Sequence, residues 1–312
     1  MELWRKTQHL TDSYLPLPPL SFNQMQTQIL GLPMLDTRSI LLAFAGETPV
    51  GYVHTIFAPS ENGYTFDYTT GQICFLCVDP KYHGAFDAAV ALIRAGEDYL
   101  TGLGATRIFG GSPSPSAPFY TGYYGGGEAI GFFQSDKIVV DAFFAAGYQI
   151  HQNTVWFHRN LRDSLPTPTV ETLGYDAEYN VVVGEIPNAK TWWEGCTFSN
   201  GMWLDATAHS LTAKRPVARL RTRITYPDTD GVSVTMYGKT WLASLMELRV
   251  HPDYAEEKLQ SYFLGKLLRY LLSYNQIVQI EAHAAEDTTL FSLLRCQCWI
   301  ERGHGYMFVK DV

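Results

Sequence analysis

The chain has 312 residues, of which 46% are hydrophobic and 17% are charged, and its formal net charge is -8. This length leaves room for two domains of ordinary size, and the composition is typical of a globular chain with a filled core. The negative charge, together with the lack of a cluster of basic residues, argues against a general nucleic-acid-binding protein.

The first half of the sequence predicts a hairpin, three further strands and two helices. Ser39 to Ala45 and the run VGYVHTIFAP are strand patterns joined by a short polar turn, as in a β-hairpin. ICFLCV is a third strand, and the apolar positions switch to helical spacing after Gly84. ATRIFGGS then predicts a fourth strand, VVDAFFAAGYQI a short helix ended by Gly147, and TVWFHRNL a last strand that closes the unit.

A segment with prolines and small polar residues, RDSLPTPTVETLG, predicts a linker near residues 163–170. We therefore expect an N-terminal domain of residues 1–163 and a C-terminal domain of residues 168–312. The second half predicts strands in ARLRTRITYPDTDGVSVTMYG, WLASLMELRV, IVQIEAHA and GYMFVK, with a long amphipathic helix through Leu259 to Leu271 and a short helix through Leu290 to Leu294. The alternating arginines of the first of these runs fit the solvated face of a strand.

The second half repeats the plan of the first. Val78, Pro80 and Tyr82 recur as Val250, Pro252 and Tyr254, each time between an apolar strand and a long amphipathic helix. Such a recurrence indicates two copies of one structural unit. We therefore predict a tandem arrangement of two β-rich α/β units.

The N-terminus has no apolar core of signal-peptide length, and no apolar run approaches the roughly 20 residues of a membrane span. We expect a soluble cytoplasmic protein that does not contact a membrane, and five cysteines fit a reducing compartment. Cys74 with Cys77 and Cys296 with Cys298 could on paper supply zinc ligands. In an apolar strand, however, positions three apart point to opposite faces, so we predict buried thiols and no metal site.

The order of elements resembles that of the GNAT superfamily of acyl-CoA N-acyltransferases, here as a tandem pair over residues 39–161 and 217–310. The resemblance implies an α/β (α+β) fold of two GNAT-like domains, each a mixed, mostly antiparallel twisted sheet flanked by helices. It also implies a V-shaped opening between the strand before Asp79 and its neighbour. The implied co-substrate is acetyl-CoA or another acyl-CoA.

In this family the loop after the V-x-P strand reads R/Q-x-x-G-x-G/A, and its backbone N–H groups bind the CoA pyrophosphate at the start of a helix. The resemblance carries this role to the end of the strand and to the loop in the first half, namely to Cys77, Val78, His83, Gly84, Ala85, Phe86, Asp87 and Ala88. Phe86 replaces the first motif glycine, and its helical spacing with Ala89 predicts a ring that turns into the core. The alternative is a packed helix start that holds no ligand.

The matching run in the second half, residues 255–260, contains neither motif glycine and has Glu256 and Glu257 where a pyrophosphate would lie. Like charges about 4 to 6 Å apart repel by on the order of 1 kcal/mol even in solvent. The first half is therefore expected to be the better CoA site.

A GNAT enzyme attacks the thioester directly with the substrate amine, so it needs a base and often a tyrosine that protonates the departing sulfur. The resemblance places that tyrosine at Phe143 in the first half and at Leu294 in the second, so both copies lack it. The long loop SPSPSAPFYTGYYGGGEAIGFFQSD offers Tyr120 and Tyr124 as substitutes, or else it packs between the domains. Glu247 is the candidate base, or it forms a salt bridge with Arg249 or Arg221, or it simply faces solvent.

The function that follows is an acyl-CoA-dependent N-acyltransferase, using acetyl-CoA and acting on a small-molecule or protein amine. The alternative is a catalytically degenerate tandem GNAT protein with a ligand-binding or scaffold role, which the loss of glycines and tyrosines favours. Neither reading implies a nucleic acid or a membrane as partner. A homo-oligomer is compatible with the sequence, which does not fix the oligomeric state.

Overall fold

The computed structural model describes residues 3, 22–111, 119–120, 131–163, 170–186, 189–198, 201–225, 241–255 and 257–312. Its α-helices are α2 (Phe22–Gln24), α3 (Ala85–Gly102), α4 (Lys137–Ala145), α5 (Val170–Glu178), α6 (Trp192–Phe198), α7 (Glu257–Leu272) and α8 (Thr289–Cys296), and the other short helices are η1 (Met25–Leu30), η2 (Thr37–Ser39) and η3 (Pro252–Tyr254). Its strands are β1 (Ile40–Ala45), β2 (Thr48–Pro59), β3 (Phe66–Val78), β4 (Arg107–Gly110), β5 (Phe132–Phe133), β6 (Gln149–Asn160), β7 (Tyr179–Glu185), β8 (Met202–Ser210), β9 (Arg215–Thr225), β10 (Trp241–Val250), β11 (Ile277–Ala285) and β12 (Ile300–Asp311).

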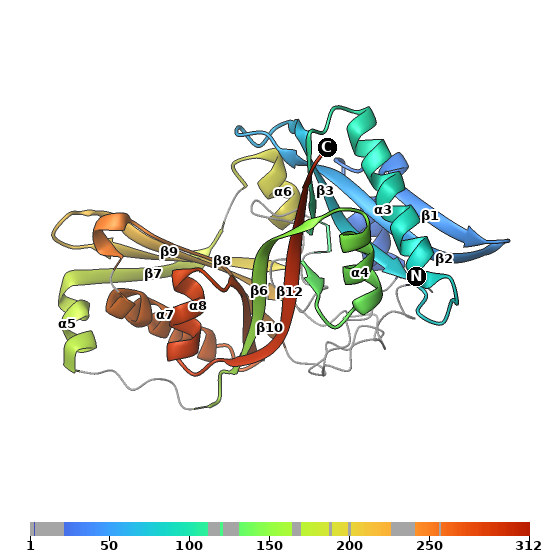
Figure 1. Cartoon of the computed structure of the whole chain (residues 1–312). Helices are drawn as coiled ribbons and strands as arrows, with labels where there is room; N and C mark the ends of the chain where they lie inside the picture. The colour runs from blue at the N-terminus through green and yellow to red at the C-terminus, as the bar shows by residue number, and fades with distance from the viewer. Residues whose placement is uncertain are drawn as a thin grey trace.

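The strands form one mixed sheet in the order β1-β2-β3-β4-β12-β6-β11-β10-β9-β8-β7, and β5 pairs with β12 outside this path. Among the described strands, β3 with β4 and β10 with β11 pair in parallel, and the other pairs are antiparallel. Helices α3 and α4 cover one half of the sheet and α7 and α8 cover the other (Figure 1). The predicted fold class, a mostly antiparallel twisted sheet flanked by helices, is confirmed.

The two halves exchange their last strands, which the sequence did not predict. β12 from the end of the chain pairs with β4 of the first half, while β6 of the first half pairs with β11 of the second half. The long strands β6 and β12 also pair with each other and run side by side through the middle of the molecule (Figure 1). The prediction that TVWFHRNL closes the first unit was therefore wrong, because that strand completes the sheet of the other half.

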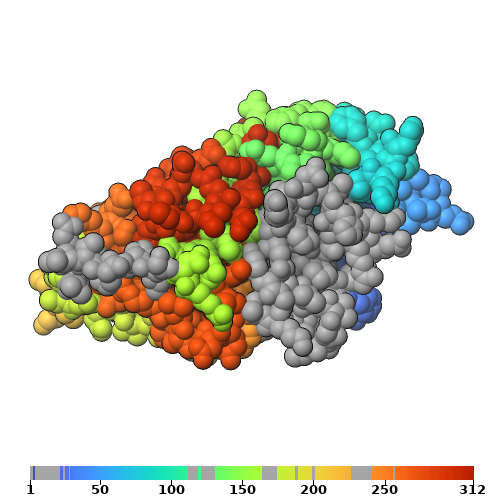
Figure 2. Space-filling model, turned by 90° about the horizontal axis from the view of Figure 1, so that it is seen from below, coloured from blue at the N-terminus to red at the C-terminus, as the bar shows by residue number. Residues whose placement is uncertain are grey.

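The exchange brings the C-terminal residues into the core of the first half. Phe308 of β12 is fully buried and stacks on Phe143 of α4 with ring centroids 4.7 Å apart. Lys310 donates to Glu97 of α3 and to the carbonyl of Ala146, both over 2.8 Å. In the space-filling view the red atoms of the last residues accordingly meet the green atoms of the first half (Figure 2).

Equivalent bulges in β3 and β10 support the internal repeat. The register of β3 shifts at Cys74, and the register of β10 shifts at Met246, where each strand faces its antiparallel neighbour. The bulge also corrects an expectation, since Cys74 and Cys77 do not face opposite sides but lie in the same hydrophobic cluster. One extra residue in the strand reverses the alternation between them. Both thiols are buried, and burial raises their pKa values.

Sequence reasoning missed several elements between the two recognised units, namely α5, β7, α6 and β8. β7 is an edge strand in which no residue is fully buried, so its pattern lacks the apolar signal of a core strand. The predicted turn and strand beyond Thr225 lie outside the described residues, as does most of the predicted linker. No helix in the described part of the chain is long and apolar enough to cross a membrane.

Candidate functional site

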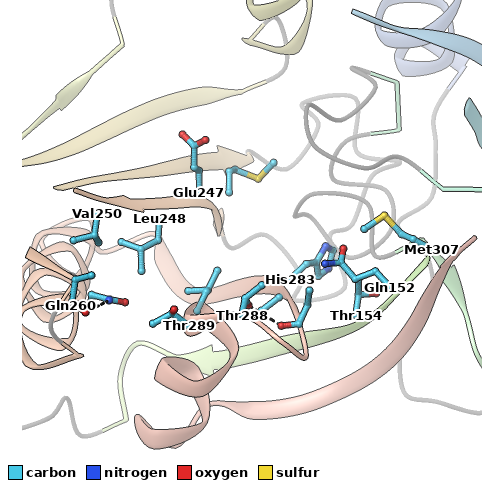
Figure 3. A pocket seen from close by; sticks show the side chains of 15 residues that line it. Gln152, Thr154, Glu247, Leu248, Val250, Gln260, His283, Thr288, Thr289 and Met307 are labelled. Atoms are coloured by element: carbon cyan, nitrogen blue, oxygen red, sulfur yellow. Dashed lines mark hydrogen bonds between the residues drawn. The ribbon is translucent and has the colours of Figure 1, made fainter. Parts of the chain in front are cut away.

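The parallel strands β10 and β11 pair as far as Leu245 and Ala282 and then separate. The bulge at Met246 turns β10 away from β11 at this point. A cavity of about 510 Å³ opens between the separated ends and is lined by 15 residues (Figure 3). We refer to this cavity as the second cleft.

The second cleft reaches both faces of the sheet. Leu248, Val250 and Leu290 line it on the face covered by α7 and α8, where they pack against the core of the second half. Thr154 and His283 line it from the opposite face, since the residues next to them, Val155 and Ala284, point into that core. The exchanged strands β6 and β12 thus form part of its wall, through Gln152, Thr154 and Met307.

His283 has no hydrogen-bond partner in the part of the chain that the structure describes. Both of its ring nitrogens are buried, although the residue as a whole is partly accessible. Burial lowers the pKa of His283 to about 3, so its imidazole is neutral near pH 7. The ring of Trp156 meets it edge to face, with centroids 6.5 Å apart.

A buried carboxyl group lies two residues before His283 on the same face of β11. Glu281 accepts from the indole Nε1 of Trp156 over 3.1 Å and from Ser244 Oγ over 3.3 Å. Burial raises the pKa of Glu281 well above its usual value, and the nearby guanidinium of Arg223 opposes that rise. Desolvation disfavours the carboxylate, so this group is held as the neutral acid across a wider pH range than an exposed glutamate.

Glu247, the predicted base, lies at the edge of the second cleft, and its carboxylate is turned away from the other lining side chains (Figure 3). Its two oxygens form salt bridges with Arg219, at 2.7 Å, and with Arg249. The ion-pair alternative is therefore the one observed in the structure, with Arg249 as expected and with Arg219 rather than Arg221. As a base, Glu247 would first have to release an arginine.

Arg219, Arg221 and Arg223, the alternating arginines of β9, are each partly or fully buried, so the expected solvated face was wrong. Arg223 is 3% exposed, and Arg221 is held by Asp205 at 2.9 Å and by Glu194 at 3.6 Å. Helix α6 supplies Glu194 and the ring of Phe198, and both contact Arg221. Arg219 and Arg221 line another cavity, distinct from the second cleft, of about 570 Å³ on the face of the sheet that carries Glu247.

The start of α7 offers little to a phosphate group. Glu257 occupies its first turn, and none of residues 255–260 is a glycine. Gln260 turns back and donates to the carbonyl of Ala255 over 3.3 Å, which closes the turn on itself (Figure 3). The start of α8 does offer a polar group to the second cleft, since Thr288 is the N-cap of that helix and lines the cleft.

In the first half the corresponding strands β3 and β4 pair from Thr70 to Ile73 and then part. Phe75 lies at this point between the rings of Tyr52 and Tyr120, at centroid distances of 5.2 and 4.5 Å. Phe75, Cys77 and Tyr120 are each at most 3% exposed. Among the described residues, aromatic rings therefore occupy the position that corresponds to the second cleft.

Tyr120, one of the predicted catalytic residues, is part of this packing. Its hydroxyl lies 3.0 Å from Nδ1 of His54, and burial raises its pKa well above the usual range. Tyr124, the other predicted tyrosine, lies outside the described residues. The two helix positions that lack a hydroxyl, Phe143 and Leu294, are both fully buried.

The predicted CoA loop of the first half forms the start of α3. Gly84 is the N-cap without a side-chain bond, the N–H of Ala85 donates to the carbonyl of Tyr82 over 3.0 Å, and the N–H of Ala88 donates to Gly84 over 2.9 Å. Phe86 is 43% exposed, so the expectation that its ring turns into the core was wrong. The buried face of α3 begins at Ala85 instead, one residue earlier.

His83 to Ala88 keep their assignment as a cofactor loop only as a prediction, as do Cys77 and Val78. Phe86 and Asp87 line an open groove of about 650 Å³ along the outer side of α3, which also touches Ala145 of α4. This groove is separate from the packed end of β3.

Strand registers allow the two halves to be compared residue by residue. Tyr52 and His54 pair with Cys77 and Phe75 in the first half, in the same places as Arg219 and Arg221 pair with Arg249 and Glu247 in the second. The first half thus has aromatic and apolar side chains at the positions where the second half has charged ones. In the sequence, only the period-2 alternation of a strand could have assigned these side chains to a face of the sheet. The bulge in each strand shifts that alternation by one residue, so the assignment fails.

No protein-family model matches the sequence, and no curated protein matches it. Solved structures do match. A tandem GNAT protein from the clavulanic acid biosynthesis pathway has 12% identity and a TM-score of 0.58, over 95% of this chain and 97% of that one. A GCN5-related N-acetyltransferase from Sphaerobacter thermophilus has 12% identity and a TM-score of 0.56, over 92% and 85%.

A third match is the glucosamine N-acetyltransferase region of a fungal multi-domain beta-N-acetylglucosaminidase, with 15% identity and a TM-score of 0.59. The match covers 92% of this chain and 36% of the larger fungal one. At these identities the likeness concerns the fold. It agrees with the repeated bulge, the two parallel strand pairs and the two halves of the sheet described above. The chain therefore has the tandem GNAT fold, that of the acyl-CoA N-acyltransferases which its predicted order of elements resembles.

Proposed function

We propose that the protein is an acyl-CoA-dependent N-acyltransferase that uses the second cleft as its transfer site. The observation that carries this proposal is the cavity of about 510 Å³ between β10 and β11, which is open to both faces of one sheet. A cleft of this kind can receive the thioester from one face and the amine from the other. The two reactants would then meet between the strands, where the bound geometry replaces a random encounter.

The reaction needs few groups from the protein. The amine nitrogen forms a bond with the thioester carbonyl carbon, the bond from carbon to sulfur breaks, and the amine proton ends on the CoA sulfur. Leu248 and Val250 give the helix-side wall an apolar surface that fits the thioester arm of an acyl-CoA. The same wall keeps water from competing with the amine.

The acceptor is proposed to be an amine on a small molecule or a protein, and acetyl-CoA the acyl donor. The sheet face that carries Glu247 has charged groups around a cavity of about 570 Å³, including Asp205 and Arg221. A polar amine would find hydrogen-bond partners there. The names of the similar structures, which are N-acetyltransferases, support an acetyl donor.

Calorimetry with acetyl-CoA tests the proposal and its location. Ala285→Trp would fill the second cleft from β11, and we expect it to weaken acetyl-CoA binding at least tenfold. Gly84→Glu is the matched variant for the first half, because it places a carboxylate at the start of α3, and we expect a change of less than threefold. The reverse pattern would move the site to the first half. No binding by the wild type at millimolar acetyl-CoA would refute the transferase proposal.

A second candidate function is ligand binding without acyl transfer. Glu257 at the start of α7 favours it, because a carboxylate there repels the diphosphate of CoA. A panel of amines with acetyl-CoA and a thiol reagent separates the candidates, since only a transferase releases CoA in proportion to the amine. Binding without amine-dependent thiol release would leave the second candidate.

The compartment that fits this function is the cytoplasm, which supplies acyl-CoA and keeps thiols reduced. All five cysteines carry free thiols, in agreement with that proposal.

A further inference from the structure

His283 combines three properties that no other described residue of the second cleft has. It lines the cavity, its neutral imidazole has a ring nitrogen that can accept a proton from a bound substrate, and both its ring nitrogens are buried without a partner among the described residues. An unsatisfied buried polar atom costs about 1 to 3 kcal/mol. Such a group in a cavity wall is best explained by a ligand that supplies the missing hydrogen bonds.

We propose that His283 is a catalytic residue that carries the proton of the substrate amine to the departing sulfur. The proposal rests on the acyl transfer proposed above and names the group that moves its proton. It assigns to β11 a role that sequence reasoning gave to Glu247 on β10 and to the tyrosines of the long loop.

His283 lies where the proposed reaction would take place. It follows Ala282, which forms the last pair between β11 and β10, so its side chain stands where the two strands begin to separate. Figure 3 shows the ring inside the cavity, close to the side chains of Gln152 and Thr154. The indole of Trp156 supports the ring edge to face and limits its rotation.

The other titratable lining residue is less suited to the task. Of the described residues that line the second cleft, Glu247 and His283 are the ones that titrate. Glu247 is occupied by Arg219 and Arg249, and its carboxylate points out of the cavity (Figure 3). Glu281 faces the same side of the sheet as His283 but is committed to Trp156 and Ser244.

The chemistry balances with one histidine. A neutral imidazole has a lone pair on one ring nitrogen, which accepts the proton once the amine nitrogen has bonded to the carbonyl carbon and has become acidic. The bond from carbon to sulfur then breaks, and the imidazolium returns the proton to the thiolate. The products are the amide and CoA with a free thiol, and the imidazole is neutral again. This route needs no hydroxyl at Phe143 or Leu294, where the structure has none.

The first experiment records the ring nitrogens of the histidines by NMR in the full-length protein, with His283→Gln used for assignment. Saturating acetyl-CoA is expected to shift the ring resonances of His283 by several ppm, because a hydrogen-bond partner arrives. His54 is the matched internal reference, since it is fully buried, has an unpartnered Nε2 within the described residues, and lies in the first half. Its resonances should not move.

The second experiment compares His283→Gln with His54→Gln in the amine-dependent release of CoA. We expect His283→Gln to lower kcat about 10² to 10³-fold, as for loss of a proton-transfer group, with acetyl-CoA affinity within threefold. We expect kcat of His54→Gln to remain within threefold of the wild type. The His283→Gln profile of rate against pH should also lose its dependence on a group of low pKa.

The outcomes separate this inference from the proposed function. If the wild type binds acetyl-CoA and the His283 resonances stay in place, or if His283→Gln keeps the wild-type kcat, the inference is overturned and the transferase proposal stands. If the wild type binds no acetyl-CoA, both are overturned. A fall in kcat together with an equal fall in acetyl-CoA affinity would mean that His283 shapes the cleft and does not move the proton.

Discussion

Replacing His54 and His283, two histidines whose pKa values burial lowers to about 3, is predicted to remove part of the acid sensitivity of the fold. The two residues lie in different halves, and burial of their rings lowers the pKa of each to about 3, from an ordinary value of 6.5. Below about pH 6.5 the unfolded chain takes up a proton at each site, while the folded chain does not. Acidification therefore favours the unfolded state.

The magnitude follows from the gap between the two pKa values. Each histidine reduces the free energy of unfolding by about 1.4 kcal/mol for every pH unit below 6.5, and this continues until the folded ring is protonated near pH 3. Between about pH 6.5 and pH 5, each site therefore contributes a loss of about 2 kcal/mol, and the two sites together about 4 kcal/mol. Above pH 6.5 the stability that they contribute is fully present.

Urea unfolding followed by tryptophan fluorescence at about pH 5, 6, 7 and 8 measures this loss. His54→Gln and His283→Gln should each reduce the difference between pH 7 and pH 5 by about 2 kcal/mol, and the double variant by about twice that amount. The comparison uses differences across pH, so a constant penalty for burying an amide cancels. A double variant with the same pH dependence as the wild type would refute the reasoning, because it would mean that the folded histidines are protonated as readily as exposed ones.

Three further predictions concern the buried acid, the start of α3 and the exchanged strands. Glu281→Gln should remove a decline in stability of about 1.4 kcal/mol per pH unit above pH 4.5, because the raised pKa of Glu281 keeps it protonated only in the folded chain while the amide still accepts from Trp156; chemical denaturation from pH 5 to 8 checks this. Phe86→Glu should change the free energy of unfolding by no more than about 0.5 kcal/mol, since the ring is 43% exposed, and a loss above about 3 kcal/mol by the same measurement would show a core ring. Residues 1–163 and 168–312 made separately should each fail to give a folded monomer, since each lacks the strand that completes its sheet, and co-expression should recover a complex on size-exclusion chromatography; two independently folded halves would contradict the exchange.

Local sequence patterns predicted many of the helices and strands. The strands before Asp79 and His251 and the helices after them follow from apolar spacing and from the repeated V-x-P-x-Y junction, and the structure has β3, α3, β10 and α7 there. These signals are strong because strand and helix periods depend on neighbouring residues. The missed elements, such as β7, are edge strands or short helices whose side chains stay partly exposed, so they show no clear period.

Details of the site depended on features that local pattern does not contain. The bulges at Cys74 and Met246 each add one residue and reverse the alternation, so the faces of Cys77 and Glu247 could not be read from position alone. Phe86 was placed in the core from spacing that fits two neighbouring helix faces almost equally well. In the structure Ala85, and not Phe86, lies on the buried face of α3.

The sequence by itself determined that the chain is a tandem of two β-rich units with a strand-to-helix junction in each, because hydrophobic periodicity and repeats are properties of neighbouring residues. Only the tertiary structure decided where the last strands lie, where a cleft opens among the described residues, and that His283 lines it with both ring nitrogens unpartnered by described residues. β6 and β12 carry similar apolar patterns, and either could complete either half of the sheet. The choice between them, and the filling of one cleft by Tyr52 and Tyr120 while the other stays hollow, depends on contacts between residues far apart in the chain.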